Sequence, residues 1–309
     1  MLEIEYPIIL GHLYWLGQGE LAAAVSEAGG LGVISAGWFK NKTELEAGIN
    51  SVRVLTRRPL GLAVTVGPDP AWKRFIEAAV EARLTAVFTT GPVLPEIPML
   101  LKPSGVRWIP YARTLEQARE SERLGADAVT VEGTPAFLGR VADALGIPVI
   151  CAGQVCDGRT FLSTLSLGVE GAQITTRFVA TRESIAHWSI KTAILDSLSK
   201  NGTGALPAHL EKVMRSLQSG CSQTKNDEGI DEFDRLLARA GEEACLKIAK
   251  EEAEKGLITG KPGYDLSAAV PTVKEVTDAL VKEALEARAR VADFLSPAEA
   301  QLQPIPYPF

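Results

Sequence analysis

Three side chains near the ends of apolar runs have the chemistry to move a proton. His12 follows the first run, Tyr111 lies in the fifth and Glu132 ends the sixth. An imidazole titrates near neutrality, and a carboxylate or phenol acts as a general acid or base when its surroundings adjust its pKa. We take these three as the candidate catalytic residues. The alternatives are a loop histidine bonded to backbone, a solvated carboxylate and a tyrosine packed on the rim.

Two short turns have the composition to hold an anion. Residues 152–154 (AGQ) and residues 175–177 (TTR) each follow an apolar run and precede a helical pattern. Small residues let backbone N–H groups and a helix N-terminus approach a negative charge, and the threonine hydroxyls and Arg177 add donors. Small residues also occur at strand ends for packing reasons alone. The pattern therefore favours a phosphate site and a structural turn about equally.

The cysteines and the remaining histidines are weaker candidates. The four cysteines have spacings that match no zinc or disulfide framework. Cys151 lies in an apolar run and is expected to behave as a small hydrophobic residue, whereas Cys156 near a helix start would have a lowered pKa if it were exposed. Of the two, Cys156 is the better candidate nucleophile. For His187 and His209 we expect structural or surface roles.

The elements that position these residues follow a strict alternation. Eight short apolar runs are each followed by a longer stretch, and the runs are rich in Val and Ile, as in parallel strands covered on both faces. We expect a (β/α)8 TIM barrel whose site lies at the carboxyl ends of the strands. A doubly wound open sheet is the alternative. The predicted strands are residues 7–10, 32–37, 61–66, 86–90, 106–112, 128–133, 148–153 and 171–177.

Beyond the eighth run the pattern becomes helical. We expect the main part of the barrel over residues 1–195, a small helical subdomain over 196–262, and a C-terminal part over 263–309. This last part is expected to contain a loop, a long helix over 273–294 that packs back on the barrel, and a proline-rich tail. The predicted helices between the strands are residues 20–28, 43–56, 70–83, 94–102, 114–124, 135–145 and 158–167.

Composition narrows the classes of partner. The chain has 309 residues, of which 46% are apolar and 23% charged, and its formal charge is −6. This size suits one large core with an appendage. The acidic balance argues against a nucleic-acid or anionic-membrane surface, which needs clustered Lys and Arg. No run approaches the ~20 apolar residues that span a bilayer, and no leader is evident, so we expect a cytoplasmic protein without a membrane partner.

Several segments resemble a known family. They are residues 20–37 (ELAAAVSEAGGLGVISAG), 123–133 (RLGADAVTVEG), 147–158 (IPVICAGQVCDG) and 168–184 (GVEGAQITTRFVATRES). In order and spacing they are similar to the nitronate monooxygenase (2-nitropropane dioxygenase) family, which includes flavin-dependent enoyl-acyl-carrier-protein reductases. Residues 256–284 resemble the closing segment of that family, in which a flavin-contacting loop precedes a helix. The resemblance covers nearly the whole chain.

The resemblance implies a TIM barrel that carries a small helical domain and binds FMN at the carboxyl ends of its strands. In the family, a glycine pair after strand seven and a Gly-Thr pair after strand eight hold the phosphate, and the loop after strand one lies against the isoalloxazine. A further contact follows strand three. Carried onto this chain, the implied cofactor-binding residues are Gly11, His12, Leu13, Ala63, Gly153, Gln154, Thr175 and Thr176.

The chain also departs from the family pattern. The loop after strand six, whose histidine is linked to proton transfer, is absent, because Glu132 and Gly133 run directly into Thr134 and Pro135. The residue after strand three is Ala63 instead of Asn, and the glycine pair has become Gly153-Gln154. A side chain added where backbone must approach a phosphate takes up space. These departures therefore affect the usual proton donor and the usual cofactor contacts.

We therefore carry three hypotheses. The first is an FMN-dependent oxidoreductase that acts on a small organic or acyl-thioester substrate, in which His12, Glu132, Tyr111 or water handles the proton. Its second reactant is NAD(P)H or oxygen, and a homodimer is one possible assembly. The alternative is a non-flavin barrel that binds a phosphorylated ligand or serves as a subunit of a complex. The third is a lyase or isomerase that uses acid and base without redox change.

Overall fold

The computed structural model describes residues 1–12, 19–184, 186, 188–201 and 270–295. Eight parallel strands form one sheet in the order β1-β8-β7-β6-β5-β4-β3-β2, and a bridge between Ile9 and Leu31 joins the first strand to the second. The sheet is therefore a closed barrel, as predicted. The strands are β1 (Ile8–Leu10), β2 (Gly32–Ser35), β3 (Leu60–Thr65), β4 (Ala86–Thr90), β5 (Arg107–Ala112), β6 (Val129–Val131), β7 (Val149–Ala152) and β8 (Gly171–Ile174).

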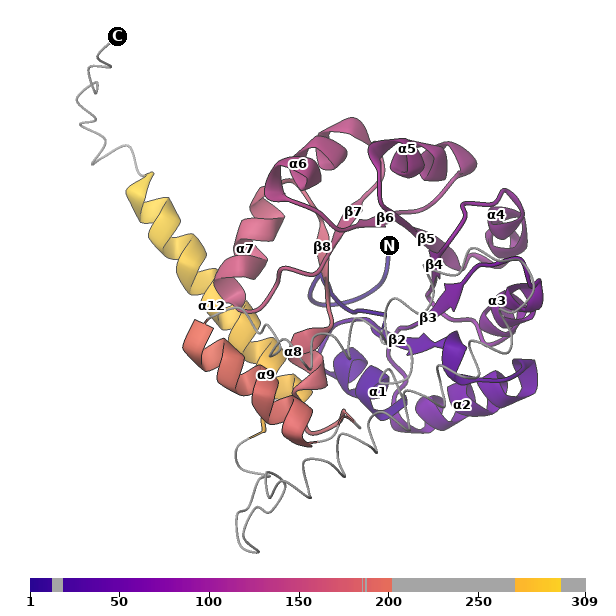
Figure 1. The fold of residues 1–309 in the computed structure, drawn as a ribbon, viewed down its shortest axis with the longest axis horizontal. Helices are drawn as coiled ribbons and strands as arrows, with labels where there is room; N and C mark the ends of the chain where they lie inside the picture. Colours follow the sequence, from indigo (N-terminus) through magenta and orange to yellow (C-terminus); the bar gives the residue numbers. More distant parts are fainter. Residues whose placement is uncertain (13–18, 185, 187, 202–269, 296–309) are drawn as a thin grey trace, which may run out of the picture.

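Helices alternate with these strands and surround the barrel (Figure 1). In α3, for example, Trp72, Ile76 and Ala79 recur at helical spacing and are buried. Burying a large apolar side chain contributes roughly 1.5–3 kcal/mol, so such faces hold each helix on the sheet. The helices are α1 (Gly19–Glu27), η1 (Ala36–Trp38), α2 (Lys42–Leu55), α3 (Ala71–Glu81), α4 (Glu96–Leu101), η2 (Lys102–Ser104), α5 (Leu115–Leu124), α6 (Pro135–Ala144), α7 (Gly158–Ser166), α8 (Thr176–Val179), α9 (Trp188–Asn201) and α12 (Val273–Phe294).

Polar side chains cap the N-termini of several of these helices. Asn41 accepts a hydrogen bond from the Glu44 N–H at the start of α2, and Thr114 does the same for the Gln117 N–H at the start of α5. Capping boxes begin α7 and α12, at Asp157 and Thr272 respectively. Each cap satisfies N–H groups that a helix leaves without partners, which stabilises the helix start by about 1 kcal/mol.

Successive side chains along each strand point alternately into the barrel and toward the surrounding helices. Val129 and Val131 of β6 pack in a buried cluster with Leu138 and Val141 of α6, so they face the helices. Because successive residues of a strand point to opposite sides, Thr130 between them faces the interior of the barrel. This alternation decides which residues reach the mouth of the barrel.

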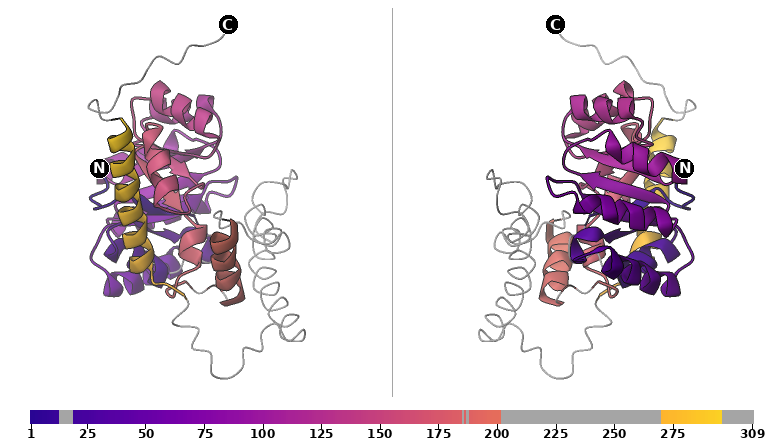
Figure 2. Two further views of the ribbon diagram at one scale, coloured as in Figure 1. Left: turned by 90° about the vertical axis from the view of Figure 1, so that its left-hand side faces the viewer. Right: turned by 90° about the vertical axis from the view of Figure 1, so that its right-hand side faces the viewer.

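The C-terminal helix α12 packs along the outside of the barrel against α7 (Figures 1 and 2). The two helices meet at Gly158, where an added Cβ would lie 2.4 Å from the Ala284 nitrogen and 2.5 Å from the Leu280 oxygen. The Gly158 N–H donates to the carboxylate of Glu283 at 2.8 Å. The absence of a side chain at Gly158 therefore allows this close approach.

The fold confirms the barrel and the predicted helix over residues 273–294. Helix α9 begins the helical region after the eighth strand, but most of the proposed subdomain (196–262) and the tail lie outside the described residues. The division into three parts therefore stays a prediction. Leu13, His187 and His209 also lie outside the described residues. Within the described part of the chain, no helix is long and apolar enough to cross a membrane.

Candidate active site

Polar side chains at the carboxyl ends of neighbouring strands are joined in pairs around the mouth of the barrel. Three hydrogen bonds link β1 to β2, β3 to β4, and β5 to β6, and each joins side chains more than 20 residues apart in sequence. In TIM barrels this end carries the active site. The pairs are His12–Ser35 at 3.1 Å, Thr65–Thr90 at 3.2 Å and Tyr111–Glu132 at 2.7 Å.

His12 lies at the mouth, directly beyond β1. Its Nε2 is within hydrogen-bond distance of the Ser35 hydroxyl, so it contacts a side chain rather than the backbone alone. Burial lowers the pKa of His12 to about 4, because a charged imidazolium would lose its hydration there. The ring is therefore neutral at physiological pH. A neutral imidazole can donate or accept a hydrogen bond but carries no positive charge toward a ligand.

Tyr111 and Glu132 form the second pair on the candidate catalytic list. Tyr111 pairs with Thr130 in the register of β5 and β6, which brings the phenol beside the carboxylate that follows β6. The phenol is half-buried and donates to Glu132 Oε2 at 2.7 Å. Burial, and then this hydrogen bond to Glu132, raise the pKa of Tyr111. The tyrosine therefore stays protonated and acts as a hydrogen-bond donor.

The turn after β7 holds two successive residues in the left-handed region. Gly153 has a φ of 76° and Gln154 a φ of 64°. A non-glycine residue in this region costs roughly 1–2 kcal/mol. The Gln154 amide donates to the Gly133 carbonyl, which ties this turn to the one after β6. Among the described residues beyond its chain neighbours, Glu132 Oε1 is the one atom within 4 Å of a Cβ added at Gly153, at 3.7 Å.

The turn after β8 lies against the end of β1. A Cβ at Gly11 would lie 1.9 Å from the Thr175 hydroxyl, so glycine is required for the two strand ends to approach. Thr176 begins the short helix α8, and Arg177 follows within it, partly buried. Burial lowers the pKa of Arg177, while nearby Glu283 opposes that shift. Gly11, Thr175 and Thr176 thus lie close together, where β1 and β8 end at the barrel mouth.

The sequence suggested that the N-terminus of α7 helps to bind an anion at the turn of residues 152–154, but its N–H groups already have partners in the protein. The Asp157 side chain accepts the Thr160 N–H at 2.8 Å, and the Glu283 carboxylate accepts the Gly158 N–H. Protein carboxylates therefore already bind the first N–H groups of this helix. An anion at the turn would have to rely on Gly153 and Gln154 instead.

Two further expectations need correction. Ala63 lies inside β3, not after it, and it is 2% exposed, in register with Ser35 and Phe88. Its small side chain faces the same side as Ser35, below the mouth. Cys156 was expected to have a lowered pKa if exposed, but burial and the neighbouring Asp157 raise the pKa of this thiol. Its role as a nucleophile is therefore not supported.

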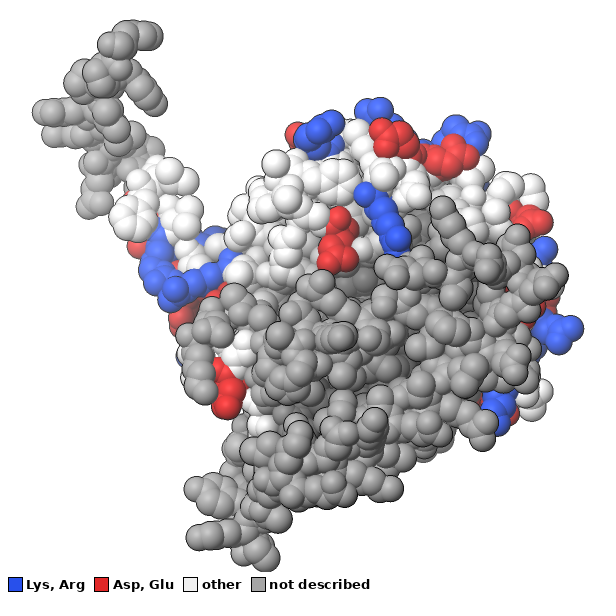
Figure 3. Space-filling model, in the orientation of Figure 1, with Lys and Arg blue, Asp and Glu red and all other residues white. Residues whose placement is uncertain are grey.

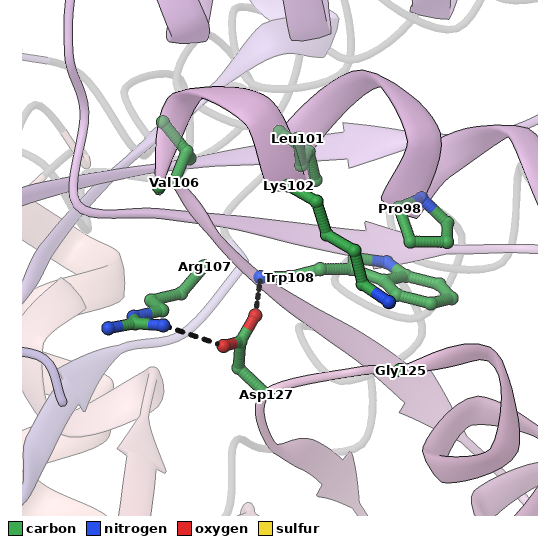
Figure 4. A pocket seen from close by; sticks show the side chains of 9 residues that line it. Pro98, Leu101, Lys102, Val106, Arg107, Trp108, Gly125 and Asp127 are labelled. Carbon is green, nitrogen blue, oxygen red and sulfur yellow. Dashed lines mark hydrogen bonds and ion pairs between the residues drawn. The ribbon is translucent and has the colours of Figure 1, made fainter.

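A shallow pocket of about 80 Å³ lies at the opposite end of the strands (Figure 4). Its charged residues have structural partners: Asp127 accepts the Trp108 N–H at 2.9 Å and pairs with Arg107 at 3.0 Å. The Lys102 ammonium lies beside Gly125 at the C-terminus of α5, where the helix dipole favours a positive charge. These contacts stabilise the fold, so we place the candidate active site at the mouth.

The described residues form no metal cluster, and the face drawn in Figure 3 carries charges of both signs. Among them, no group of three or more His, Cys, Asp or Glu side chains is placed to hold a metal ion. On the face in Figure 3, acidic and basic side chains of the described part lie interspersed around the edge.

Solved structures share this architecture. FabK from Thermotoga maritima is 26% identical, with 95% of this chain and 97% of that chain covered and a TM-score of 0.69. A nitroalkane oxidase from Streptomyces ansochromogenes is 22% identical, and the alignment covers 93% of this chain and 98% of that chain with a TM-score of 0.69. At that lower identity the second match shows the fold alone. Together they confirm the TIM barrel.

Sequence relatives and a family model carry the classification. A probable nitronate monooxygenase of Staphylococcus haemolyticus is 29% identical over 63% of this chain and 71% of its own length. A Rhodococcus jostii protein named "(3aS,4S,5R,7aS)-5-hydroxy-7a-methyl-1-oxo-octahydro-1H-indene-4-carboxyl-CoA dehydrogenase" is 31% identical over 62% of this chain, and the aligned region spans 57% of that protein. The model described as nitronate monooxygenase matches residues 1–283. The chain therefore belongs to the nitronate monooxygenase family, and it is an oxidoreductase of this flavin-dependent family.

Proposed function

We propose that this protein is an FMN-dependent oxidoreductase that acts on a small organic or acyl-thioester substrate at the mouth of the barrel. The observation that carries the proposal is the pair of left-handed residues, Gly153 and Gln154, which follow β7 beside the strand end of β8. The Gly153 N–H donates to the Gln173 carbonyl at 3.3 Å, which fixes the turn next to Thr175. Among the described residues beyond its chain neighbours, no atom lies closer than 3.7 Å to a Cβ added at Gly153, which supports the approach of a phosphate to this backbone.

The residues present fit the phosphate end of FMN. Gly153 and Gln154 keep the left-handed backbone that a glycine pair adopts most easily, and the Gln154 side chain turns away to Gly133. Thr175 and Thr176 supply hydroxyl donors on the facing turn. We propose that these four residues hold the phosphate.

Gly11, His12 and Ala63 would be the residues that contact the isoalloxazine, together with Leu13, which lies outside the described residues. Ala63 is 2% exposed, and its methyl side chain takes up little space in the interior of the barrel. When bound, FMN supplies hydride or electron transfer, and the protein supplies binding, orientation and electrostatics. His12, neutral at physiological pH, presents a hydrogen-bonding group without adding charge.

Two classes of substrate have support from the relatives. The family is named for nitronates, and the Rhodococcus relative is named for a carboxyl-CoA compound. Both classes carry a carbon beside an electron-withdrawing group, nitro or thioester. We propose NAD(P)H or oxygen as the second reactant, and a cytoplasmic site of action, in keeping with the free thiol of Cys151.

Cofactor identity is the test of this proposal. The purified protein should release FMN on denaturation, as identified by mass spectrometry, and the apoprotein should regain visible flavin absorbance when FMN is added. Riboflavin, which lacks the phosphate, should bind at least about 100-fold more weakly, because charge-assisted hydrogen bonds to phosphate contribute about 1.5–3 kcal/mol each. A protein that cannot be reconstituted with FMN, or that binds riboflavin equally well, would contradict the proposed phosphate site.

A non-flavin barrel and a lyase or isomerase without redox chemistry are not favoured by these findings. The family match covers residues 1–283 and therefore includes the whole described barrel. An oxidoreductase explains the relatives and the mouth of the barrel together.

A further inference from the structure

Gln173 carries a nearly buried amide that the described part of the protein leaves without a partner. It is the last residue but one of β8, and it is 7% exposed. Among the described residues, its side-chain amide forms no hydrogen bond. Buried amides in folded proteins almost always have hydrogen-bond partners, so each exception requires an explanation, such as a ligand that completes the site.

The Gln173 side chain points into the barrel. Cys151 faces the helix layer in one cluster with Val129, and it pairs with Ala172 in the register of β7 and β8. Because successive residues of a strand point to opposite sides, Gln173 after Ala172 faces the interior. The Gln173 carbonyl also accepts the Gly153 N–H at 3.3 Å. The amide therefore lies on the interior side of the turn that we propose for the phosphate.

The residues around this amide are accessible and small. Ala152, the register partner of Gln173 on β7, is partly exposed, and Gly153 after it is exposed. Thr175, two residues beyond Gln173, is partly exposed as well. An accessible surface therefore extends from the proposed phosphate residues to the strand end beside Gln173, where a ligand held at Gly153 and Thr175 would meet the amide.

We propose that the Gln173 amide binds hydroxyl groups of the ribityl chain of FMN and selects this chain over an apolar linker between phosphate and ring. The proposal deepens the proposed function and rests on it for the cofactor. In FMN the ribityl chain is bonded directly to the phosphate, and each of its hydroxyls both donates and accepts. A glutamine amide matches these groups, because its oxygen accepts and its NH2 group donates. An apolar chain in the same place would leave the amide without partners.

Thr130 of β6 provides a matched control. Its hydroxyl is also buried in the interior of the barrel without a hydrogen-bond partner in the described part of the chain. In the register of β6, β7 and β8, Thr130 aligns with Gly171, two residues before Gln173. It therefore lies on a more distant strand and further from the turn proposed for the phosphate. Thr130→Val removes an unpartnered polar group of the interior and leaves the proposed contact in place.

The experiment compares FMN with an analogue in which an alkyl chain of the same length joins the phosphate to the ring, so that only the ribityl hydroxyls are missing. In a fluorescence titration of the full-length apoprotein, the wild-type chain should bind FMN about tenfold or more tightly than the analogue, because the analogue leaves the amide unpaired. Gln173→Met, which keeps the length of the side chain, should bind the two flavins within about twofold of each other. Thr130→Val should keep the wild-type preference.

A thermal melt separates ligand binding from a structural role. Gln173→Met removes a buried amide without a partner, so its apoprotein should melt roughly 1–3 °C above the wild-type apoprotein, whereas saturating FMN should raise its Tm by less. A lower Tm of the variant apoprotein would assign the amide to the fold and overturn the proposal. Equal binding of both flavins by the wild-type chain, or an unchanged preference in Gln173→Met, would also overturn it and leave the proposed function standing. A wild-type protein that binds neither flavin would overturn both.

Discussion

Acidification should destabilise the fold through His12. Burial holds the pKa of this imidazole at about 4 in the folded protein, whereas the ordinary value is 6.5. Between about pH 6.5 and pH 4, His12 is therefore protonated in the unfolded chain but not in the folded protein. The stability that the neutral ring contributes is complete above pH 6.5 and is lost as the pH falls toward 4. At about 1.4 kcal/mol for each pH unit of that interval, the loss is about 3 kcal/mol, with about 2 kcal/mol gone by pH 5.

The measurement compares urea unfolding of the wild-type protein and His12→Gln at pH 7 and pH 5. Glutamine keeps a hydrogen-bonding group and does not titrate, so carboxylates elsewhere affect both proteins equally. The wild-type protein should lose about 2 kcal/mol more than the variant. Because the chain has three histidines, the variant also identifies the His12 ring signal in an NMR titration. A midpoint near 6.5 for that signal, or the same pH dependence in both proteins, would refute the reasoning.

The remaining predictions concern packing and the cofactor turn. Gly158→Ala would place a Cβ 2.4 Å from the Ala284 nitrogen, and we expect a loss of about 3 kcal/mol in unfolding free energy and roughly 6 °C in Tm. Gly139→Ala in α6 would place a Cβ 3.7 Å from the Leu167 oxygen, the nearest described atom outside the helix, and should instead stabilise by about 0.5–1 kcal/mol. Equal Tm values for the two variants would contradict the close approach at Gly158. Gly153→Ala, at a φ of 76° and beside Glu132, should weaken FMN binding at least about tenfold in a fluorescence titration, and an unchanged Kd would argue against the phosphate turn.

Much of the fold could be predicted because its signals are local. The period of apolar residues distinguishes strand from helix within a single window, and the helix caps lie within three residues of the N–H groups they bind. The long helix α12 matched its predicted range because Thr272 and Glu275 form a capping box at its start. Eight such units in succession leave few topologies other than a barrel.

The candidate site was only partly predictable. Strand ends identified His12, Tyr111, Glu132 and the two turns, because parallel strands bring their carboxyl ends to one face. Ser35, the partner of His12, was missed, since a serine at a strand end has no distinctive pattern. Its position near the end of the predicted strand 32–37, next to a predicted site strand, was the one available signal.

The sequence alone determined the order of the elements, the family, and the residue types that reach the mouth of the barrel. Tertiary structure decided how those residues act. The hydrogen bond of Tyr111 to Glu132 joins residues 21 apart, and that of Gly158 to Glu283 joins residues 125 apart. The pKa of His12 depends on burial by distant parts of the chain. Periodicity describes neighbours along the chain, whereas charge, proton affinity and close approach depend on neighbours in space, which exist only once the barrel has closed.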